Sequence, residues 1–383
     1  MKNKCFLPSL PVLLAFFLLA ACEPTLTTEP EVLPAVDPEI MEPEVMLNNR
    51  IEGRHAIAYV TYYGSLTPDP ACITHINYAF AELYVRDNIY QGFKVQGNVS
   101  RFEQIAALKK TNPQLKICLS FTHGVSNSDN KQDGGFSAMS KSPEGRKAFA
   151  EDCKAFLERY GLDGIDLDWE FPGLSWSGAA CDPSCDTDNY VLLVKQLRET
   201  LGLEYIISYA GYCSDKVAVS GGYRYVDIQG MDQYVDYVNI MTYDLDEAPK
   251  HHSALSDPRA YKDCKRAVSA YLSAGVPYSK LVLGIPFYGR RSFSTSPTAI
   301  SYKKILQLDR YQFRRNEWDN VASCPYVATM GGEFYCGYDN PRSISIKGAW
   351  VRENGMRGLM YWEYDQDDDR GTLRKSVWNA VMQ

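Results

Sequence analysis

Histidine is scarce in this chain, which has five histidines among 383 residues. None of them stands at a spacing typical of a zinc site, and we therefore expect neither a metal nor another cofactor. Basic residues form no stripe, which argues against nucleic acid as a partner. The apolar run Phe6 to Ala21 is shorter than the roughly 20 residues that a membrane span requires.

The amino-terminal segment has the features of an export signal. Lys2 and Lys4 precede the apolar run, and small residues follow it in Leu19-Ala20-Ala21-Cys22. This ending resembles a bacterial lipobox, which implies a signal peptide over residues 1–21 and acylation of Cys22. The chain would then be exported and anchored through lipid to a bacterial membrane, on the periplasmic or cell-surface side of the outer membrane. An ordinary signal peptide with an incidental cysteine is the alternative.

Residues 22–50 are expected to be an acidic, proline-rich linker behind this anchor. Residues 23–47 contain six glutamates, one aspartate and five prolines, and no lysine or arginine occurs between Cys22 and Arg50. Prolines interrupt helices and like charges repel, so we expect no folded structure in the linker. The remaining residues 48–383 carry a net charge of only −2, which suits an uncharged substrate.

Cysteines are numerous for a chain with no metal motif, and there are 11 of them. Nine lie beyond Cys22, and export permits disulfides. The two most plausible local pairs are Cys181 with Cys185 and Cys324 with Cys336. Cys118 lies in an apolar run, and we expect it to be a buried free thiol.

The folded part, residues 51–383, alternates apolar strand-like runs with helical segments. This alternation predicts parallel β-α units, and eight such runs favour a closed (β/α)8 TIM barrel of the α/β class. About 70 residues separate the last two runs, and we expect a small α+β insertion subdomain at about 291–345. The eight runs are Ala56–Val60, Ile73–Phe80, Leu115–Phe121, Gly164–Asp168, Tyr205–Tyr209, Tyr237–Met241, Leu281–Pro286 and Gly358–Trp362.

Three carboxylates close the fourth run. Side chains alternate along a strand, so Asp166, Asp168 and Glu170 share one face. Two like charges about 4 Å apart repel by about 4 kcal/mol at an effective dielectric of 20, which would raise the pKa of a carboxyl in the row. A carboxyl kept protonated near neutral pH is what a general acid needs. Surface acids exposed to water are the alternative, but Ile165 and Leu167 between them argue against it.

The row of carboxylates resembles a known family. Asp163-Gly164-Ile165-Asp166-Leu167-Asp168-Trp169-Glu170 is similar to the Asp-x-x-Asp-x-Asp-x-Glu motif of glycoside hydrolase family 18, and the following Phe-Pro-Gly is similar to its chitinase branch. Four further segments resemble the second, sixth, seventh and eighth strands of that family, in order: residues 76–80, 238–244, 283–290 and 358–363. The resemblance extends from about Ala56 to Asp369.

This resemblance implies a retaining, substrate-assisted hydrolysis of β-1,4 linkages in chitin or N-acetylglucosamine oligosaccharides. Glu170 would be the general acid/base, and Asp168 would stabilise the 2-acetamido group that attacks its own anomeric carbon. Asp166 would share a proton with Asp168, and Tyr243 would bind the acetamido oxygen. Trp362 would be the floor of the −1 subsite.

The resemblance also implies a set of residues around this centre. Met241 and Asp244 would line the pocket, Tyr288 and Arg290 would contact substrate, and Asp163 would support the row. Tyr59 and Phe80 would also line the pocket, although packing explains these two residues equally well.

One segment departs from the family pattern. The third strand there commonly ends in Ser-x-Gly-Gly, whereas this chain has Ser120-Phe121-Thr122-His123. Glycines allow a close approach of the substrate, and the larger side chains put the glycone subsites in question. His123 is as well explained by a structural role as by contact with sugar.

Two other functions remain open for a monomer of this kind. An endo-β-N-acetylglucosaminidase acting on N-glycans would use the same carboxylates. A non-catalytic chitin-binding lectin would share the fold, although such proteins typically lose the acid or one of its aspartate partners. The sequence does not distinguish chitin from N-glycan, or endo from exo cleavage.

Overall fold

A computed structural model describes residues 50–123, 135–174 and 180–383. The signal peptide, Cys22 and all but the last residue of the acidic linker lie outside these ranges. In the part of the chain that the structure describes, no helix has the length and apolarity needed to cross a membrane.

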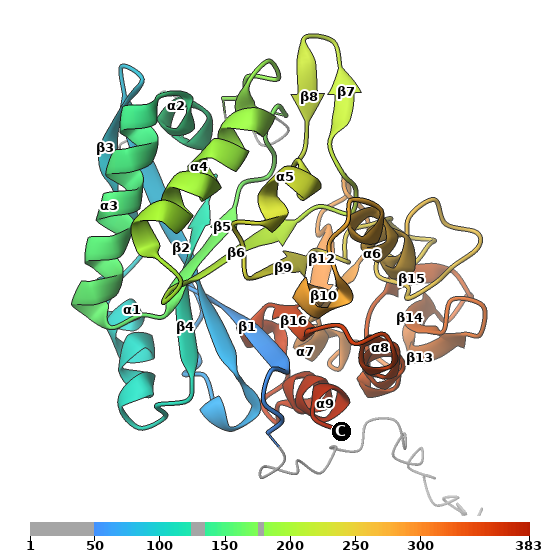
Figure 1. The fold of residues 1–383 in the computed structure, drawn as a ribbon. Helices are drawn as coiled ribbons and strands as arrows, with labels where there is room; N and C mark the ends of the chain where they lie inside the picture. The colour runs from blue at the N-terminus through green and yellow to red at the C-terminus, as the bar shows by residue number, and fades with distance from the viewer. Residues whose placement is uncertain (1–49, 124–134, 175–179) are drawn as a thin grey trace, which may run out of the picture. The chain divides into compact units, whose positions relative to one another are not determined.

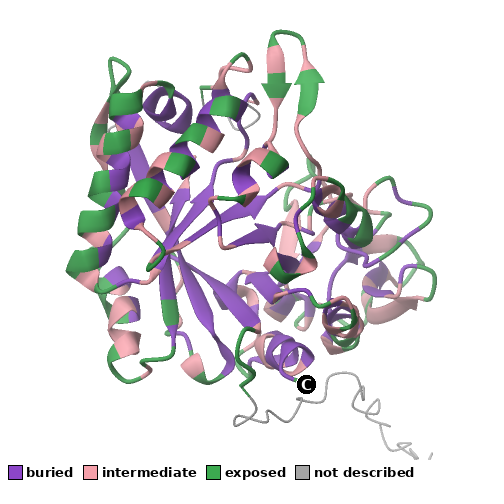
Figure 2. Cartoon of the chain, viewed as in Figure 1, coloured by how far each residue is buried: buried purple, intermediate pink, exposed green. Residues whose placement is uncertain are grey.

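Eight parallel strands of the described chain form a closed barrel, as predicted. They pair in the order β1-β2-β4-β5-β6-β9-β10-β16, and the parallel pairing of β1 with both β2 and β16 closes the ring. Strand residues are almost all buried (Figure 2). The strands are β1 His55–Thr61, β2 His75–Arg86, β4 Lys116–Thr122, β5 Gly164–Asp168, β6 Ile206–Gly211, β9 Tyr237–Ile240, β10 Leu281–Pro286 and β16 Gly358–Trp362.

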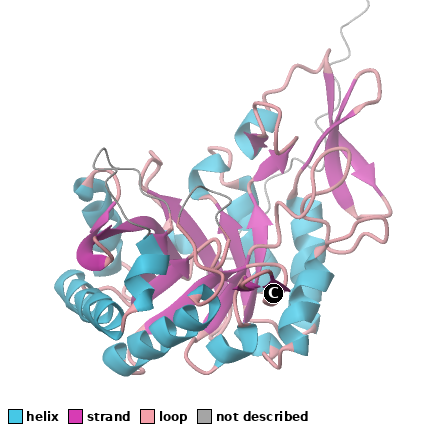
Figure 3. Ribbon diagram, turned by 90° about the horizontal axis from the view of Figure 1, so that it is seen from above, coloured by secondary structure: helices cyan, strands magenta, loops and turns pink. Residues whose placement is uncertain are grey.

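Helices cover the outside of the barrel (Figures 1 and 3). The longest shows why they begin and end where they do. Ser142 accepts a hydrogen bond from the Gly145 backbone, Pro143 opens the helix, and Gly161 ends it with a φ of 63°. The helices are α1 Val99–Ala106, α2 Gly135–Lys141, α3 Pro143–Tyr160, α4 Asp186–Leu201, α5 Ile228–Asp232, α6 Cys264–Ser273, α7 Tyr302–Ile305, α8 Pro341–Glu353 and α9 Thr372–Val381.

Three smaller strands extend from the barrel. β3 Ile89–Val95 pairs antiparallel with the end of β2. β7 Val217–Val219 and β8 Gly222–Arg224 form a hairpin that projects beyond β6 (Figure 1).

A second sheet lies between β10 and β16 in the sequence. Its five strands pair in the order β12-β11-β15-β14-β13. They are β11 Tyr288–Arg290, β12 Ala299–Ser301, β13 Phe313–Asp319, β14 Cys324–Thr329 and β15 Phe334–Gly337. The first of these begins two residues after β10 ends, so the added sheet starts directly at the end of a barrel strand.

Neither expected disulfide is present, and both predictions were wrong. Cys324 and Cys336 are free and buried. In the β14–β15 ladder Cys336 stands opposite Val327, three residues from Cys324. Three strand positions span about 10 Å, which exceeds the Cα separation that a disulfide bridges.

The other pair, Cys181 and Cys185, is also free. Hydrogen bonds to Asp182 close the turn between them, because its carbonyl oxygen accepts from the backbone of Cys185 and of Asp186. The turn therefore needs no covalent link. Cys118 is buried and free, as expected.

Candidate active site

The carboxylate row lies at the carboxyl end of β5. Side chains alternate along this strand, so the acids and the apolar residues between them lie on opposite faces, as predicted. Trp169 packs on the helix side, stacked on Phe136 of α2 with ring centroids 5.3 Å apart and next to Tyr190 of α4 at 5.0 Å. The acids therefore face the interior of the barrel.

A pocket of about 250 Å³ opens above this row. Most of its lining residues lie in the last part of a barrel strand or in the segment that follows it, which is where TIM barrels carry their sites. Nine of the residues predicted from the sequence or the family resemblance contribute to its lining. The lining residues are Tyr59, Phe80, Thr122, Asp168, Glu170, Ala210, Met241, Tyr243, Asp244, Tyr288 and Trp362.

Asp166 lies beneath the pocket and is fully buried. Four donors surround its two carboxylate oxygens. Oδ2 accepts from Tyr59 Oη at 2.8 Å and from Ser120 Oγ at 2.7 Å, and Oδ1 accepts from Ser208 Oγ at 2.7 Å and Asn239 Nδ2 at 3.1 Å. Burial raises the pKa of Asp166, and these four hydrogen bonds oppose the rise. An acceptor-only group fits four donors, so the geometry describes an aspartate anion.

Asp168 and Glu170 form a hydrogen-bonded carboxyl pair. Burial, the charge of Glu170 and the charge of Asp166 raise the pKa of Asp168 well above its usual range. Burial also raises the pKa of Glu170 to about 7, the charge of Asp244 adds to this rise, and the hydrogen bond to Asp168 opposes it. The pair therefore holds a proton near neutral pH. The proton sharing between Asp166 and Asp168 that the resemblance implied stays a prediction, and the structure adds a hydrogen bond between Asp168 and Glu170.

Asp244 forms the opposite wall as a fixed anion. Arg290 donates two hydrogen bonds to its carboxylate, from Nε to Oδ1 at 2.9 Å and from Nη2 to Oδ2 at 2.6 Å. Buried His252 places Nδ1 at 3.3 Å from the same Oδ1. Burial alone would raise the pKa of Asp244, but His252 and Arg290 hold it well below its usual range. Arg290 is not part of the lining, and it contacts two residues that are, Asp244 and the ring of Tyr288 at 5.4 Å from its centroid.

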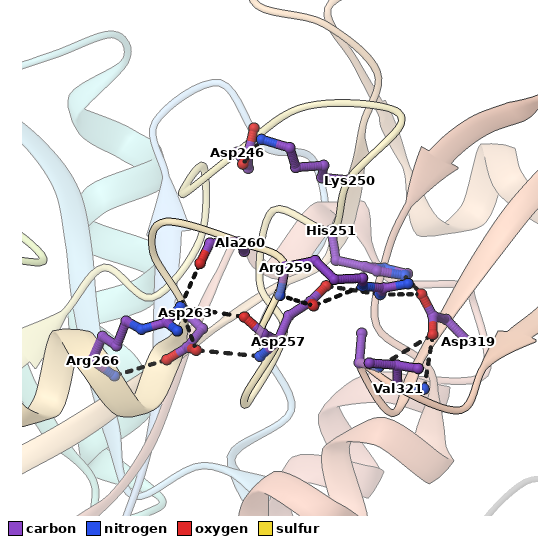
Figure 4. A network of polar contacts seen from close by, with 11 residues as sticks. Asp246, Lys250, His251, Asp257, Arg259, Ala260, Asp263, Arg266, Asp319 and Val321 are labelled. Atoms are coloured by element: carbon purple, nitrogen blue, oxygen red, sulfur yellow. Dashed lines mark hydrogen bonds and ion pairs between the residues drawn. The ribbon is translucent and has the colours of Figure 1, made fainter.

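A polar network fixes the loop that follows Asp244 (Figure 4). His251 Nε2 lies 3.2 Å from Asp319 Oδ2 in the second sheet, and Arg259 Nη2 donates to the same oxygen at 2.5 Å. Arg259 also pairs with Asp257 through two hydrogen bonds of 2.8 and 2.9 Å. The second sheet thus holds the loop whose first residues enter the pocket.

Aromatic rings form the floor of the pocket. Trp362 is half-buried and stacks on Phe80, with ring centroids 5.7 Å apart and planes 24° apart. Tyr59 lies 5.5 Å from the same tryptophan and at the same time donates to Asp166. Tyr59 therefore links the floor to the carboxylate row, which packing alone would not explain.

The segment that departs from the family pattern, at Thr122 and His123, lies next to Glu170. His123 Nδ1 accepts from the backbone N–H of Glu170 at 3.4 Å, and His123 is not among the lining residues. Thr122, the last residue of β4, does line the pocket. The structure therefore places Thr122 toward the substrate space and His123 against the backbone.

Asp163 lies at the opposite end of β5 from the pocket. It pairs with Lys109 at 2.5 Å and Lys116 at 3.1 Å and accepts from the backbone of Ile117. It therefore joins the start of β5 to the start of β4 and touches no residue of the site.

Sequence reasoning assigned no role to three donors, Ser120, Ser208 and Asn239. Each lies on the barrel strand β4, β6 or β9, at a position that faces the interior with Asp166. Strand parity on neighbouring strands is the signal that could have found them. Among the described residues, no group of three or more His, Cys, Asp or Glu side chains could hold a metal ion.

Comparison with known proteins agrees with this geometry. Residues 55–367 match the family described as "Glycosyl hydrolases family 18". The chain belongs to this family of glycoside hydrolases. It is 26% identical to Chitinase A1 of Niallia circulans over 83% of this chain and 56% of that protein. It is 30% identical to Chitinase C of Streptomyces lividans over 78% of this chain and 53% of that protein. The chain thus spans about half the length of these relatives.

A solved structure resembles it along nearly the same range. The structure is of a family 18 N-acetylglucosaminidase from Paenibacillus barengoltzii, with a TM-score of 0.70 and 28% identity. The similarity covers 86% of this chain and 100% of that one.

Proposed function

We propose that the protein hydrolyses β-1,4 linkages in chitin or N-acetylglucosamine oligosaccharides, with Glu170 as the acid. One observation carries the proposal: a single pocket brings together Glu170, a carboxyl whose pKa burial raises to about 7, its buried partner Asp168 and the stacked ring of Trp362. A general acid works best when its pKa is close to the operating pH. The matched relatives named as chitinases support the choice of substrate.

In the first step Glu170 transfers its proton to the glycosidic oxygen. The bond from that oxygen to the anomeric carbon breaks, and the carbonyl oxygen of the 2-acetamido group forms a new bond to the same carbon. Trp362 stacks against the sugar ring, and Tyr243 donates a hydrogen bond to the acetamido oxygen. These contacts hold the attacking and departing atoms in line.

In the second step the Glu170 carboxylate takes a proton from water. The water oxygen bonds to the anomeric carbon and reopens the acetamido ring, which retains the configuration. Asp168 accepts a hydrogen bond from the acetamido N–H and stabilises its positive charge. Asp168 must exchange its contact with Glu170 for this one, and Asp166, already held by four donors, stays in place.

The test compares the wild type with Glu170→Gln on N-acetylglucosamine oligomers and on a high-mannose glycopeptide. We expect the wild type to cleave the oligomers, with kcat/KM falling as pH rises through about 7 because Glu170 then loses its proton. The variant should lose at least a hundredfold in kcat. Equal, nonzero rates for both proteins would contradict the role of Glu170.

Other outcomes separate the alternatives. Binding of oligomers without turnover by the wild type would identify a lectin. Turnover of the glycopeptide alone would identify an endo-β-N-acetylglucosaminidase.

We further propose that the enzyme works as a monomer anchored by acylated Cys22. The argument is the lipobox-like sequence before that residue, because two or more acyl chains give stable anchoring. Mass spectrometry of the mature chain tests it. The wild type should carry acyl groups at its new amino terminus, and Cys22→Ser should carry none and leave the membrane fraction.

A further inference from the structure

A second pocket, of about 290 Å³, lies at the opposite end of the barrel. Five of its lining residues are the first residues of barrel strands: His55, His75, Lys116, Ile206 and Tyr237. The candidate active site is built from residues at the other ends of the same strands. The two pockets are therefore separated by the length of the barrel.

Three arginines line this pocket and have no acidic partner within 4 Å in the described ranges. Arg50 Nη2 donates to the backbone oxygen of Gln114 at 3.0 Å, and Arg357 Nε donates to that of Ser279 at 2.6 Å. Arg54 Nη1 is buried and has no hydrogen-bond partner in the part of the chain that the structure describes. These guanidinium groups thus keep most of their donors for another ligand.

The other charges of the pocket do not neutralise them. Lys116 is paired with Asp163 at 3.1 Å, and Asp236 is paired with Arg198 at 2.6 Å. Glu52, an exposed residue, is the remaining carboxylate among the lining residues. The lining therefore contains three arginines without an ionic partner in the described ranges and one exposed carboxylate, in a folded body that is otherwise close to neutral.

Two histidines complete the pocket. The rings of His55 and His75 lie 4.1 Å apart, and both residues are buried. His55 is 8% exposed, and its Nδ1 atom has no hydrogen-bond partner within the described ranges. Burial lowers the pKa of His75 to about 3, and the nearby Arg50, Lys116 and Arg357 contribute to the lowering. The same surroundings hold the pKa of His55 far below its usual range.

We propose that this pocket binds a phosphate group, supplied by free phosphate or by the phosphodiester of a lipid headgroup. Guanidinium groups match phosphate oxygens in geometry as well as in charge. Three unpaired cations suit a phosphate better than a carboxylate, because phosphate offers more oxygens to separate donors. Arg54 and His55 also line the pocket, and one nitrogen of each, Arg54 Nη1 and His55 Nδ1, is buried without a hydrogen-bond partner among the described residues.

The test is calorimetric titration of the full chain in a micelle of nonionic, phosphate-free detergent. Inorganic phosphate is the first probe, in chloride buffer of constant ionic strength. We expect one saturable site, and at least tenfold weaker binding in Arg54→Gln and in Arg357→Gln. Arg314→Gln is the matched control, because this exposed arginine pairs with Glu317 at 3.6 Å on β13 and should bind phosphate as the wild type does.

Glycerophosphoglycerol, a deacylated lipid headgroup, is the second probe. Tighter binding than inorganic phosphate would identify a lipid as the source, and weaker binding would identify a free anion. Circular dichroism spectra that match the wild type show that the variants fold. The proposal is overturned if neither probe saturates, or if both arginine variants bind as tightly as the control.

Discussion

Ser208→Ala is the sharpest test of how the buried carboxylate is supported. Ser208 is fully buried on β6, and its hydroxyl donates to Asp166 Oδ1 at 2.7 Å. The substitution removes one of the four donors and changes little else. The anion then keeps three donors and has no access to water to replace the fourth.

The expected cost follows from the charge of the acceptor. A hydrogen bond to a charged group contributes about 1.5–3 kcal/mol to stability. At about 2–3 °C per kcal/mol, this corresponds to a fall in Tm of roughly 3–9 °C. The cost should also depend on pH. Losing a donor raises the pKa of Asp166 further, and a carboxyl whose pKa is raised on folding weakens the fold as pH increases. The penalty should therefore be larger at pH 8 than at acidic pH, where Asp166 is protonated.

Thermal unfolding followed by circular dichroism at several pH values measures this. Ser140→Ala is a matched control, because Ser140 is equally buried and its hydroxyl has no hydrogen-bond partner among the described residues. It should shift Tm by less than about 2 °C. Equal shifts for the two variants, or a Ser208→Ala penalty that does not grow with pH, would refute the assignment of Asp166 as a supported anion.

Three further predictions concern the ion pair at Asp244, the barrel strand β10 and a buried ion pair outside the pocket. Arg290→Gln removes the clamp on Asp244 and should lower kcat/KM on N-acetylglucosamine oligomers about 10- to 100-fold, measured against Arg314→Gln. Gly284→Ala should lower kcat and cost about 1–3 kcal/mol, because its Cβ would lie 2.9 Å from Tyr243 Cε1; wild-type kinetics and an unchanged Tm would contradict this. Asp339→Ala leaves buried Lys347 without its partner at 2.6 Å, and should cost about 3–5 kcal/mol in thermal or denaturant unfolding. The double variant Asp339→Leu with Lys347→Met should recover most of that loss.

The barrel was predictable because its evidence is repeated along the chain. Each apolar run needs a neighbouring strand on both sides to satisfy its backbone hydrogen bonds. Eight such runs that alternate with helices are compatible with few sheet topologies. The carboxylate row was predictable for a related reason. Residues Ile165 and Leu167 fix one face of β5 as apolar, so the acids between them had to share the other face.

The support of the row was harder to predict, because it comes from other strands. Ser120, Ser208 and Asn239 are unremarkable residues in sequence, and only their register against β5 turns them toward Asp166. Disulfide pairing failed for the same reason. Cys324 and Cys336 are close along the chain, but that closeness does not determine how far apart they lie in the β14–β15 ladder.

The hydrogen bonding within the carboxylate row also depends on contacts between strands. Four donors occupy the oxygens of Asp166, and the next carboxyl along the row, Asp168, forms its hydrogen bond with Glu170. The donors around Asp166 thus shape the hydrogen bonding of the whole row. A pattern of alternating acids contains no information on those donors.

The same eight strands also separate charge between their two ends. Acidic groups gather at the carboxyl ends, where Asp244 stays ionised and Asp168 and Glu170 keep a proton between them. Unpaired arginines gather at the amino ends. An uncharged sugar chain meets little repulsion at the first end, whereas a phosphate is repelled there and attracted to the second. Phosphate should therefore bind without competing with oligosaccharide, and phosphate concentrations that saturate the arginine pocket should leave KM unchanged.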